Sequence, residues 1–80
     1  MATTRAYVLI ETAIGKTKEV RDALKKLPDM KLVDAVTGPY DIIAVVESNT
    51  LTAVGDMVTK HIHVVSGITR TVTCLAIDIV

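Results

Sequence analysis

The chain of 80 residues has a single cysteine, Cys74, and neither tryptophan nor phenylalanine. One cysteine excludes an intramolecular disulfide and a metal site built only from cysteines of one chain. Its apolar neighbours in a predicted strand favour an inert, buried thiol. Because Tyr7 and Tyr40 are the only aromatic residues, we expect an aliphatic core.

A charge of one sign is also absent, since nine Lys and Arg balance nine Asp and Glu. The basic residues are scattered along the chain, which disfavours direct binding to nucleic acid. The longest aliphatic run, residues 42–46, is far shorter than the ~20 residues that span a bilayer, and residues 1–5 contain no hydrophobic signal region. We therefore expect a cytoplasmic protein without a membrane partner.

The length predicts one domain over residues 1–80. A chain of this size buries only somewhat over ~60% of its unfolded surface, so its stability is marginal unless another contact adds to it. Half of the residues are hydrophobic, which is a high fraction for a monomer that must cover its surface with polar groups. Both observations favour a homo-oligomer.

The spacing of hydrophobic residues predicts six elements. Strands are predicted at residues 6–10, 30–37, 41–47 and 68–80, and amphipathic helices at residues 16–27 and 51–62. Pro28 is expected to end the first helix, because proline lacks the backbone donor and disfavours helical geometry in the residue before it. In the second helix, either His61 or Ile62 completes the apolar stripe.

The order βαββαβ predicts an α+β, ferredoxin-like fold, with a four-stranded antiparallel sheet and two helices on one face. Residues 42–46 are apolar on both faces of their strand, and so is the last strand. Because the helices cover only one face, the other must find a partner. We expect two sheets to pack face to face in a homodimer of the dimeric α/β-barrel type.

Two polar segments lie next to these strands. A tight turn, residues 37–41, precedes the strand that is apolar on both faces, and Thr71 and Thr73 carry hydroxyls into the last strand. Turns of this composition are common structural punctuation, but they also carry ligand sites. The turn alone therefore leaves both interpretations open.

The order and spacing of these features resemble the ligand-binding domain of the Lrp/AsnC (feast/famine) transcriptional regulators over nearly the whole chain. The resemblance rests on Gly15, Val20, Leu24, Pro28, Thr37, Gly38, Tyr40, Asp41, Leu51, Val58, Gly67, Ile68, Thr71 and Thr73. Full-length members begin with a helix-turn-helix module that reads DNA, and this sequence has none before its first strand. We expect a stand-alone effector domain.

The resemblance implies a non-catalytic domain that binds an amino acid or a similar small effector at contacts between dimers. It implies further assembly into rings of dimers and association with full-length Lrp/AsnC regulators. It implies no cofactor. A free amino acid carries an ammonium and a carboxylate group, so its pocket needs both acceptors and donors. Asp41 is the candidate acceptor, and the candidate donors are backbone N–H groups near Gly38 and Tyr40 and the hydroxyls of Thr71 and Thr73.

Each candidate also has a structural interpretation. Gly38 suits any hairpin, Asp41 can cap its own turn, and Tyr40 can shield the end of the sheet. Threonine is favoured in strands by β-propensity alone, which explains Thr71 and Thr73 equally well.

Other functional classes fit the sequence less well. His61 and His63 lie two residues apart with no third ligand evident, so we predict no metal site. A small dimeric α/β-barrel enzyme, such as a cofactor-free monooxygenase or isomerase, is compatible with the fold. No nucleophile and base form a recognisable pair, which disfavours that alternative. An ACT-like regulatory module, with sheets side by side, is a further alternative.

Overall fold

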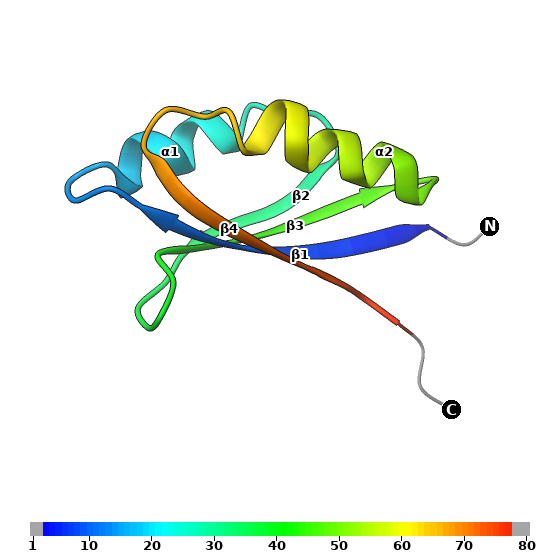
Figure 1. Ribbon diagram of the computed structural model, residues 1–80, viewed down its shortest axis with the longest axis horizontal. Coiled ribbons are helices and arrows are strands. Elements are labelled where there is room, and N and C mark those ends of the chain that lie inside the picture. Colours follow the sequence, from blue (N-terminus) through cyan, green and yellow to red (C-terminus); the bar gives the residue numbers. More distant parts are fainter. Residues whose placement is uncertain (1–2, 78–80) are drawn as a thin grey trace.

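The computed structural model describes residues 3–77. The strands are β1 (Thr4–Thr12), β2 (Met30–Ala35), β3 (Ile42–Ser48) and β4 (Ile68–Leu75), and the helices are α1 (Thr17–Leu24), α2 (Leu51–Asp56) and the π-helical η1 (Met57–Ile62). The strands form one antiparallel sheet in the order β2-β3-β1-β4, and the helices cover one of its faces (Figure 1). The predicted ferredoxin-like fold is confirmed. Within residues 3–77, no helix is long and apolar enough to cross a membrane.

The core lies between the sheet and the helices. Alternate residues of β1 point into it, and each pairs with a buried residue of β3: Ala6 with Val46, Val8 with Ala44, and Ile10 with Ile42. The helices contribute Val20, Leu24, Val54, Met57 and Ile62, which are all buried. As expected, the core is aliphatic.

Helix α1 ends at Leu24, three residues before the predicted end. The N–H groups of Lys26 and Leu27 donate to the carbonyls of Ala23 and Leu24, at 3.2 and 3.1 Å. These bonds span three residues instead of four, so the chain leaves the helix through a tighter turn before it reaches Pro28.

The second predicted helix changes its geometry at Met57. The N–H of His63 donates to the carbonyl of Val58 at 2.8 Å, five residues back, as in a π-helix. Met57 and Ile62, also five residues apart, are both buried, whereas His61 is exposed. The wider turn therefore places Ile62, and not His61, in the core.

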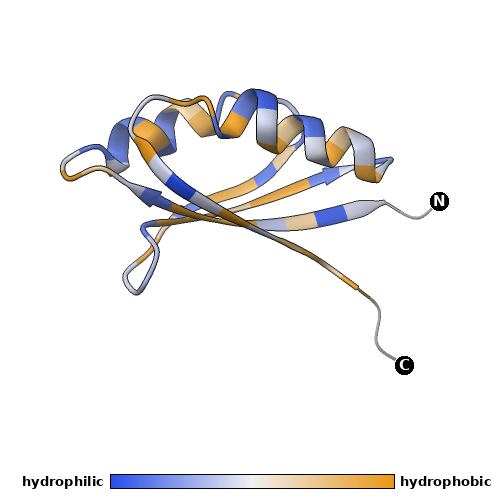
Figure 2. Ribbon diagram, viewed as in Figure 1, coloured by the Kyte–Doolittle hydropathy of each residue, from blue (hydrophilic) through white to orange (hydrophobic). Residues whose placement is uncertain are grey.

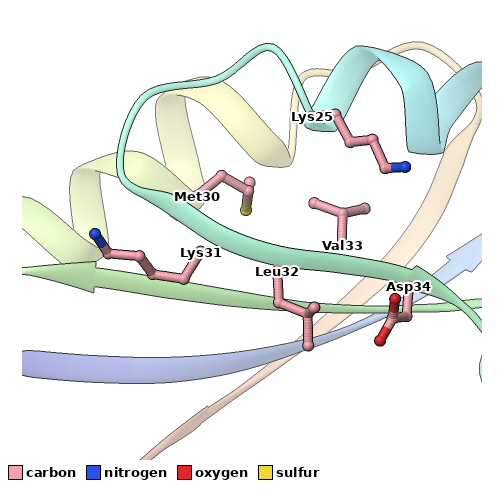
Figure 3. A pocket seen from close by; sticks show the side chains of 6 residues that line it. All are labelled: Lys25, Met30, Lys31, Leu32, Val33 and Asp34. Atoms are coloured by element: carbon pink, nitrogen blue, oxygen red, sulfur yellow. The ribbon is translucent and has the colours of Figure 1, made fainter.

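Strand β2 contains a bulge at Lys31. The pairing with β3 shifts between Met30, opposite Val46, and Leu32, opposite Val45. Met30 and Val33 consequently lie on the helix side of the strand, while Leu32 points to the other side (Figure 3). The strand ends at Ala35, two residues before the predicted end.

Strand β4 forms one edge of the sheet, and β2 forms the opposite edge. Thr71, Thr73 and Leu75 lie on the helix side, and Cys74, which pairs with Tyr7, lies on the opposite side. Cys74 is exposed, so the prediction of a buried thiol is wrong. Cys74 is exposed because an edge strand is paired along one edge only and because no helix covers the sheet face on which Cys74 lies. The strand ends at Leu75, and residues 78–80 of the predicted strand lie outside the described residues.

The sheet face opposite the helices is apolar along its middle. We call this surface, which no helix covers (Figure 1), the open face; it is formed by Tyr7, Leu9, Leu32, Ile43, Val45, Val72 and Cys74. Figure 2 shows the helices striped with hydrophilic and hydrophobic residues, as expected for elements with one buried side. Strand β3 instead begins with five consecutive apolar residues and is apolar on both faces.

Candidate functional site

The hairpin between β2 and β3 contains three of the five predicted site residues, namely Gly38, Tyr40 and Asp41. Its loop is closed by a backbone bond from the N–H of Val36 to the carbonyl of Asp41, at 2.9 Å. The N–H of Asp41 donates to the carbonyl of Ile10 in β1, also at 2.9 Å. Gly38 has a φ of +146°, which side chains disfavour, and a β-carbon placed there would have no atom within 4 Å. The backbone at Gly38 is therefore open to approach.

The Asp41 carboxylate makes contacts that anchor it. Its Oδ2 accepts from the backbone N–H of Thr12 at 2.8 Å and from the Thr12 hydroxyl at 3.2 Å. Within residues 3–77, no hydrogen bond to Oδ1 is formed. Asp41 is half-buried, so it is partly shielded from water. Asp41 thus has a structural role in which its Oδ1 has no donor among residues 3–77.

The two threonines lie on the helix side of β4. Thr71 pairs with Ile10, and its Oγ1 lies 3.2 Å from Nδ1 of His63, just after η1. Thr73 pairs with Val8 and is exposed. It lines an apolar groove of about 320 Å³ between β4 and the helices α2 and η1, together with Leu51, Val54, Gly55, Val58, Thr59 and Leu75.

The five predicted residues form two separate groups in one chain. Strand β1 lies between β3, which follows the hairpin, and β4, which carries the threonines. Two strand spacings separate them, which is roughly 10 Å across the sheet. The groove that Thr73 lines contains no hairpin residue. A single chain therefore does not gather all five around one cavity.

A second groove, of about 310 Å³, follows the free edge of β2 (Figure 3). It is lined by Lys25, Met30, Lys31, Leu32, Val33 and Asp34, none of which belongs to the predicted site. Lysines at the edge of a sheet prevent unwanted pairing with other strands. This groove is explained by the protection of an edge strand.

Two residues near the predicted site were not found from the sequence. Thr12 holds Asp41, and His63 contacts Thr71. Thr12 becomes Asp41's neighbour only because β1 pairs antiparallel with β3 in the register that sets Ile10 opposite Ile42. No local pattern at Thr12 indicates this contact. Within residues 3–77, no three His, Cys, Asp or Glu side chains form a group that could hold a metal ion.

Two ion pairs lie at the ends of the open face. Arg5 Nε is 2.6 Å from Glu47 Oε2, and Arg70 Nη1 is 3.2 Å from Glu11 Oε2. A hydrogen bond with Tyr7, together with Glu47, raises the pKa of Arg5 above its ordinary value. Arg5 therefore remains charged at any working pH, and the apolar middle of the open face is bordered by charged groups.

The fold defines a small α+β domain of the ferredoxin-like class. The family model described as "Lrp/AsnC ligand binding domain" matches residues 5–80. The chain is similar in structure to the hypothetical protein PHS023 from Pyrococcus horikoshii, with 36% identity, a TM-score of 0.87, and coverage of 94% of this chain and 90% of that one. It is also similar to TTHA0845 from Thermus thermophilus, with 34% identity, a TM-score of 0.89 and 96% coverage of both chains. The chain belongs to the Lrp/AsnC ligand-binding domain family.

A more distant likeness shows the same fold in a larger protein. The transcriptional regulator NMB0573 from Neisseria meningitidis, solved as a complex with L-Met, is 14% identical, with a TM-score of 0.83. The match covers 94% of this chain and 50% of that one, so this chain spans about half of its length. No curated protein matches the chain.

Proposed function

We propose that this chain binds a free amino acid through the hairpin residues Gly38, Tyr40 and Asp41 and the hydroxyls of Thr71 and Thr73. The observation that carries the proposal is the state of Asp41, a half-buried carboxylate that is anchored through Oδ2 and has no donor on Oδ1 within residues 3–77. A primary ammonium group supplies such a donor and neutralises the charge.

The other groups suit the carboxylate end of the same molecule. The backbone of Gly38 lies in open space, which lets an anion approach the main chain. The hydroxyls of Thr71 and Thr73 are donors, and Thr73 lies beside an apolar groove that suits an aliphatic side chain. The L-Met complex of NMB0573 supports an amino acid as the class of effector.

We propose that the site is completed between copies of the chain, because the hairpin and the threonines lie apart in one copy. The open face supports face-to-face pairing into a homodimer, since its apolar middle is bordered by the Arg5–Glu47 and Arg70–Glu11 ion pairs. An apolar centre with a polar rim is typical of protein interfaces. Dimers would then meet through the hairpin and β4, and assemble into rings.

The role that follows is regulatory and non-catalytic. The family consists of ligand-binding domains, and neighbours of the same fold include transcriptional regulators. We propose that effector binding controls assembly in the cytoplasm, with further copies or with full-length Lrp/AsnC regulators that supply the DNA-binding module. An enzyme of the dimeric α/β-barrel type remains the second candidate on the ground of its fold alone.

The proposal is tested by a thermal-shift screen against the twenty standard amino acids. An effector present at about a hundred times its dissociation constant should stabilise the fold by ~2.7 kcal/mol. A selective rise in melting temperature with one amino acid, or with a chemically related group, would support effector binding. No shift with any of them would contradict it.

A further inference from the structure

Three hydroxyl or carboxylate side chains from different elements form a continuous chain of hydrogen bonds next to the hairpin. Thr12, the last residue of β1, donates to Asp41 Oδ2 through both its backbone N–H and its hydroxyl, at 2.8 and 3.2 Å. The Thr12 hydroxyl also lies 2.7 Å from the hydroxyl of Thr17, the first residue of α1. The hairpin, the end of β1 and the start of α1 are thus joined by side chains.

The direction of these bonds follows from the chemistry of the groups. An ionised carboxylate only accepts hydrogen bonds, so the single hydroxyl hydrogen of Thr12 is used on Asp41. The oxygen of Thr12 must then accept from the hydroxyl of Thr17. All three residues are half-buried, and partial exclusion of water strengthens such a chain.

We infer that Thr12 is the positioning residue of the effector site: it fixes the Asp41 carboxylate before any effector binds and connects it to α1 through Thr17. The role of Thr12 in effector binding rests on the function proposed above. The hydrogen bonds between the three side chains do not depend on that function. Holding Oδ2 fixes the direction of Oδ1, which is the oxygen left for an ammonium group. Because the carboxylate is ordered in advance, binding does not have to restrict its rotation.

The first test needs no effector and measures the hydrogen-exchange protection factor of the Thr12 amide. Thr12→Val has nearly the same shape but no hydroxyl, Thr12→Ser keeps the hydroxyl, and Asp41→Ala removes the acceptor. We expect Thr12→Ser to match the wild type, and Thr12→Val to lose protection by about tenfold, the equivalent of a hydrogen bond to a charged group. Asp41→Ala should lose at least as much. Unchanged protection in Thr12→Val, with a loss in Asp41→Ala, would overturn the inference.

The second test measures binding by calorimetry with ligand pairs that differ only in the ammonium group. The probes are L-methionine with 4-(methylthio)butanoic acid and L-isoleucine with 3-methylpentanoic acid. Thr12→Val should weaken binding of the amino acid by about tenfold and leave the acid without the ammonium group unaffected, while Thr12→Ser should bind as the wild type does. Equal losses for both members of a pair would indicate a merely structural role and overturn the inference.

The two tests separate the inference from the proposal on which it builds. If wild-type protein binds none of the probes and gives no shift with any amino acid, the effector proposal fails, and the exchange measurement alone decides whether Thr12 positions Asp41. If the wild type binds an amino acid and Thr12→Val binds it equally well, the effector proposal stands and the inference fails.

Discussion

The backbone of Gly67 packs directly against the side chain of Val20. A β-carbon at Gly67 would lie 2.9 Å from Val20 Cγ2, and the φ of Gly67 is +100°. The carbonyl of Gly67 accepts from the N–H of Ala13 at 2.8 Å, which ties the start of β4 to the end of β1. Glycine is therefore required here both by the backbone conformation and by the lack of space.

Gly67→Ala should destabilise the fold by about 1–3 kcal/mol through the close contact of the new methyl group with Val20. The positive φ of Gly67 should add a cost of about 1–2 kcal/mol. Val20 is fully buried and, as a β-branched residue in a helix, has one strongly preferred rotamer, so it cannot move aside. Gly15→Ala is the matched control, because Gly15 has a φ of +80° but a β-carbon added there would have no atom within 4 Å. Urea unfolding at one protein concentration measures the free energy of unfolding of both variants. Equal losses in the two variants would show that the contact with Val20 costs nothing.

Leu32→Asp should break the proposed homodimer and leave the single chain folded. Leu32 is 47% exposed and lies on the open face, so a charge there costs little in one copy but would be buried between two. Val64→Asp is the control, because Val64 is 68% exposed and lies after η1, outside the open face. Light scattering should give the mass of one chain for Leu32→Asp and of an oligomer for the control. An oligomer of unchanged mass in Leu32→Asp would contradict face-to-face pairing.

Cys74 reports on the same surface through its reactivity. The thiol is exposed in one chain but lies on the open face opposite Tyr7, so pairing through this face should cover it. A thiol reagent such as Ellman's should therefore label wild-type protein slowly and Leu32→Asp at nearly the rate of the urea-unfolded chain. The Val64→Asp variant should label as slowly as the wild type. Rapid labelling of an intact wild-type dimer would place Cys74 outside the interface.

The order of the elements and the two faces of the sheet could be predicted from the sequence, because each depends on local periodicity. Residues 42–46 are apolar at every position, and because two helices can cover only one face of the sheet, this run predicts an apolar surface on the other face. The bulge at Lys31 and the π-helical turn that buries Ile62 interrupt this periodicity, so they appear only in the structure. The exposure of Cys74 depends on β4 being an edge strand, which its own sequence does not reveal.

The candidate site was predicted as five residues, but their arrangement depends on strand order. Gly38 and Asp41 lie three residues apart in one turn, and their proximity is local. Thr71 is separated from them by β1, and Thr12 reaches Asp41 only through the pairing of β1 with β3. Contacts between residues far apart in the chain follow from register and topology, which a residue pattern does not specify.

Asp41→Asn should weaken binding of the amino acid found in the screen by about tenfold or more, since the amide oxygen stays on Thr12 and an NH2 donor replaces Oδ1, the proposed acceptor for the ammonium group. The amide oxygen can still accept from the N–H and hydroxyl of Thr12, so the melting temperature without effector should change little. Asp29→Asn is the control, because it removes the same charge from an exposed loop where a φ of 61° suits Asn. Calorimetry with the same amino acid measures the affinity of the wild type and of the two variants. If Asp41→Asn binds as tightly as the wild type and Asp29→Asn, the Asp41 carboxylate does not receive the ammonium group, and its function is to hold Thr12 and the end of β1.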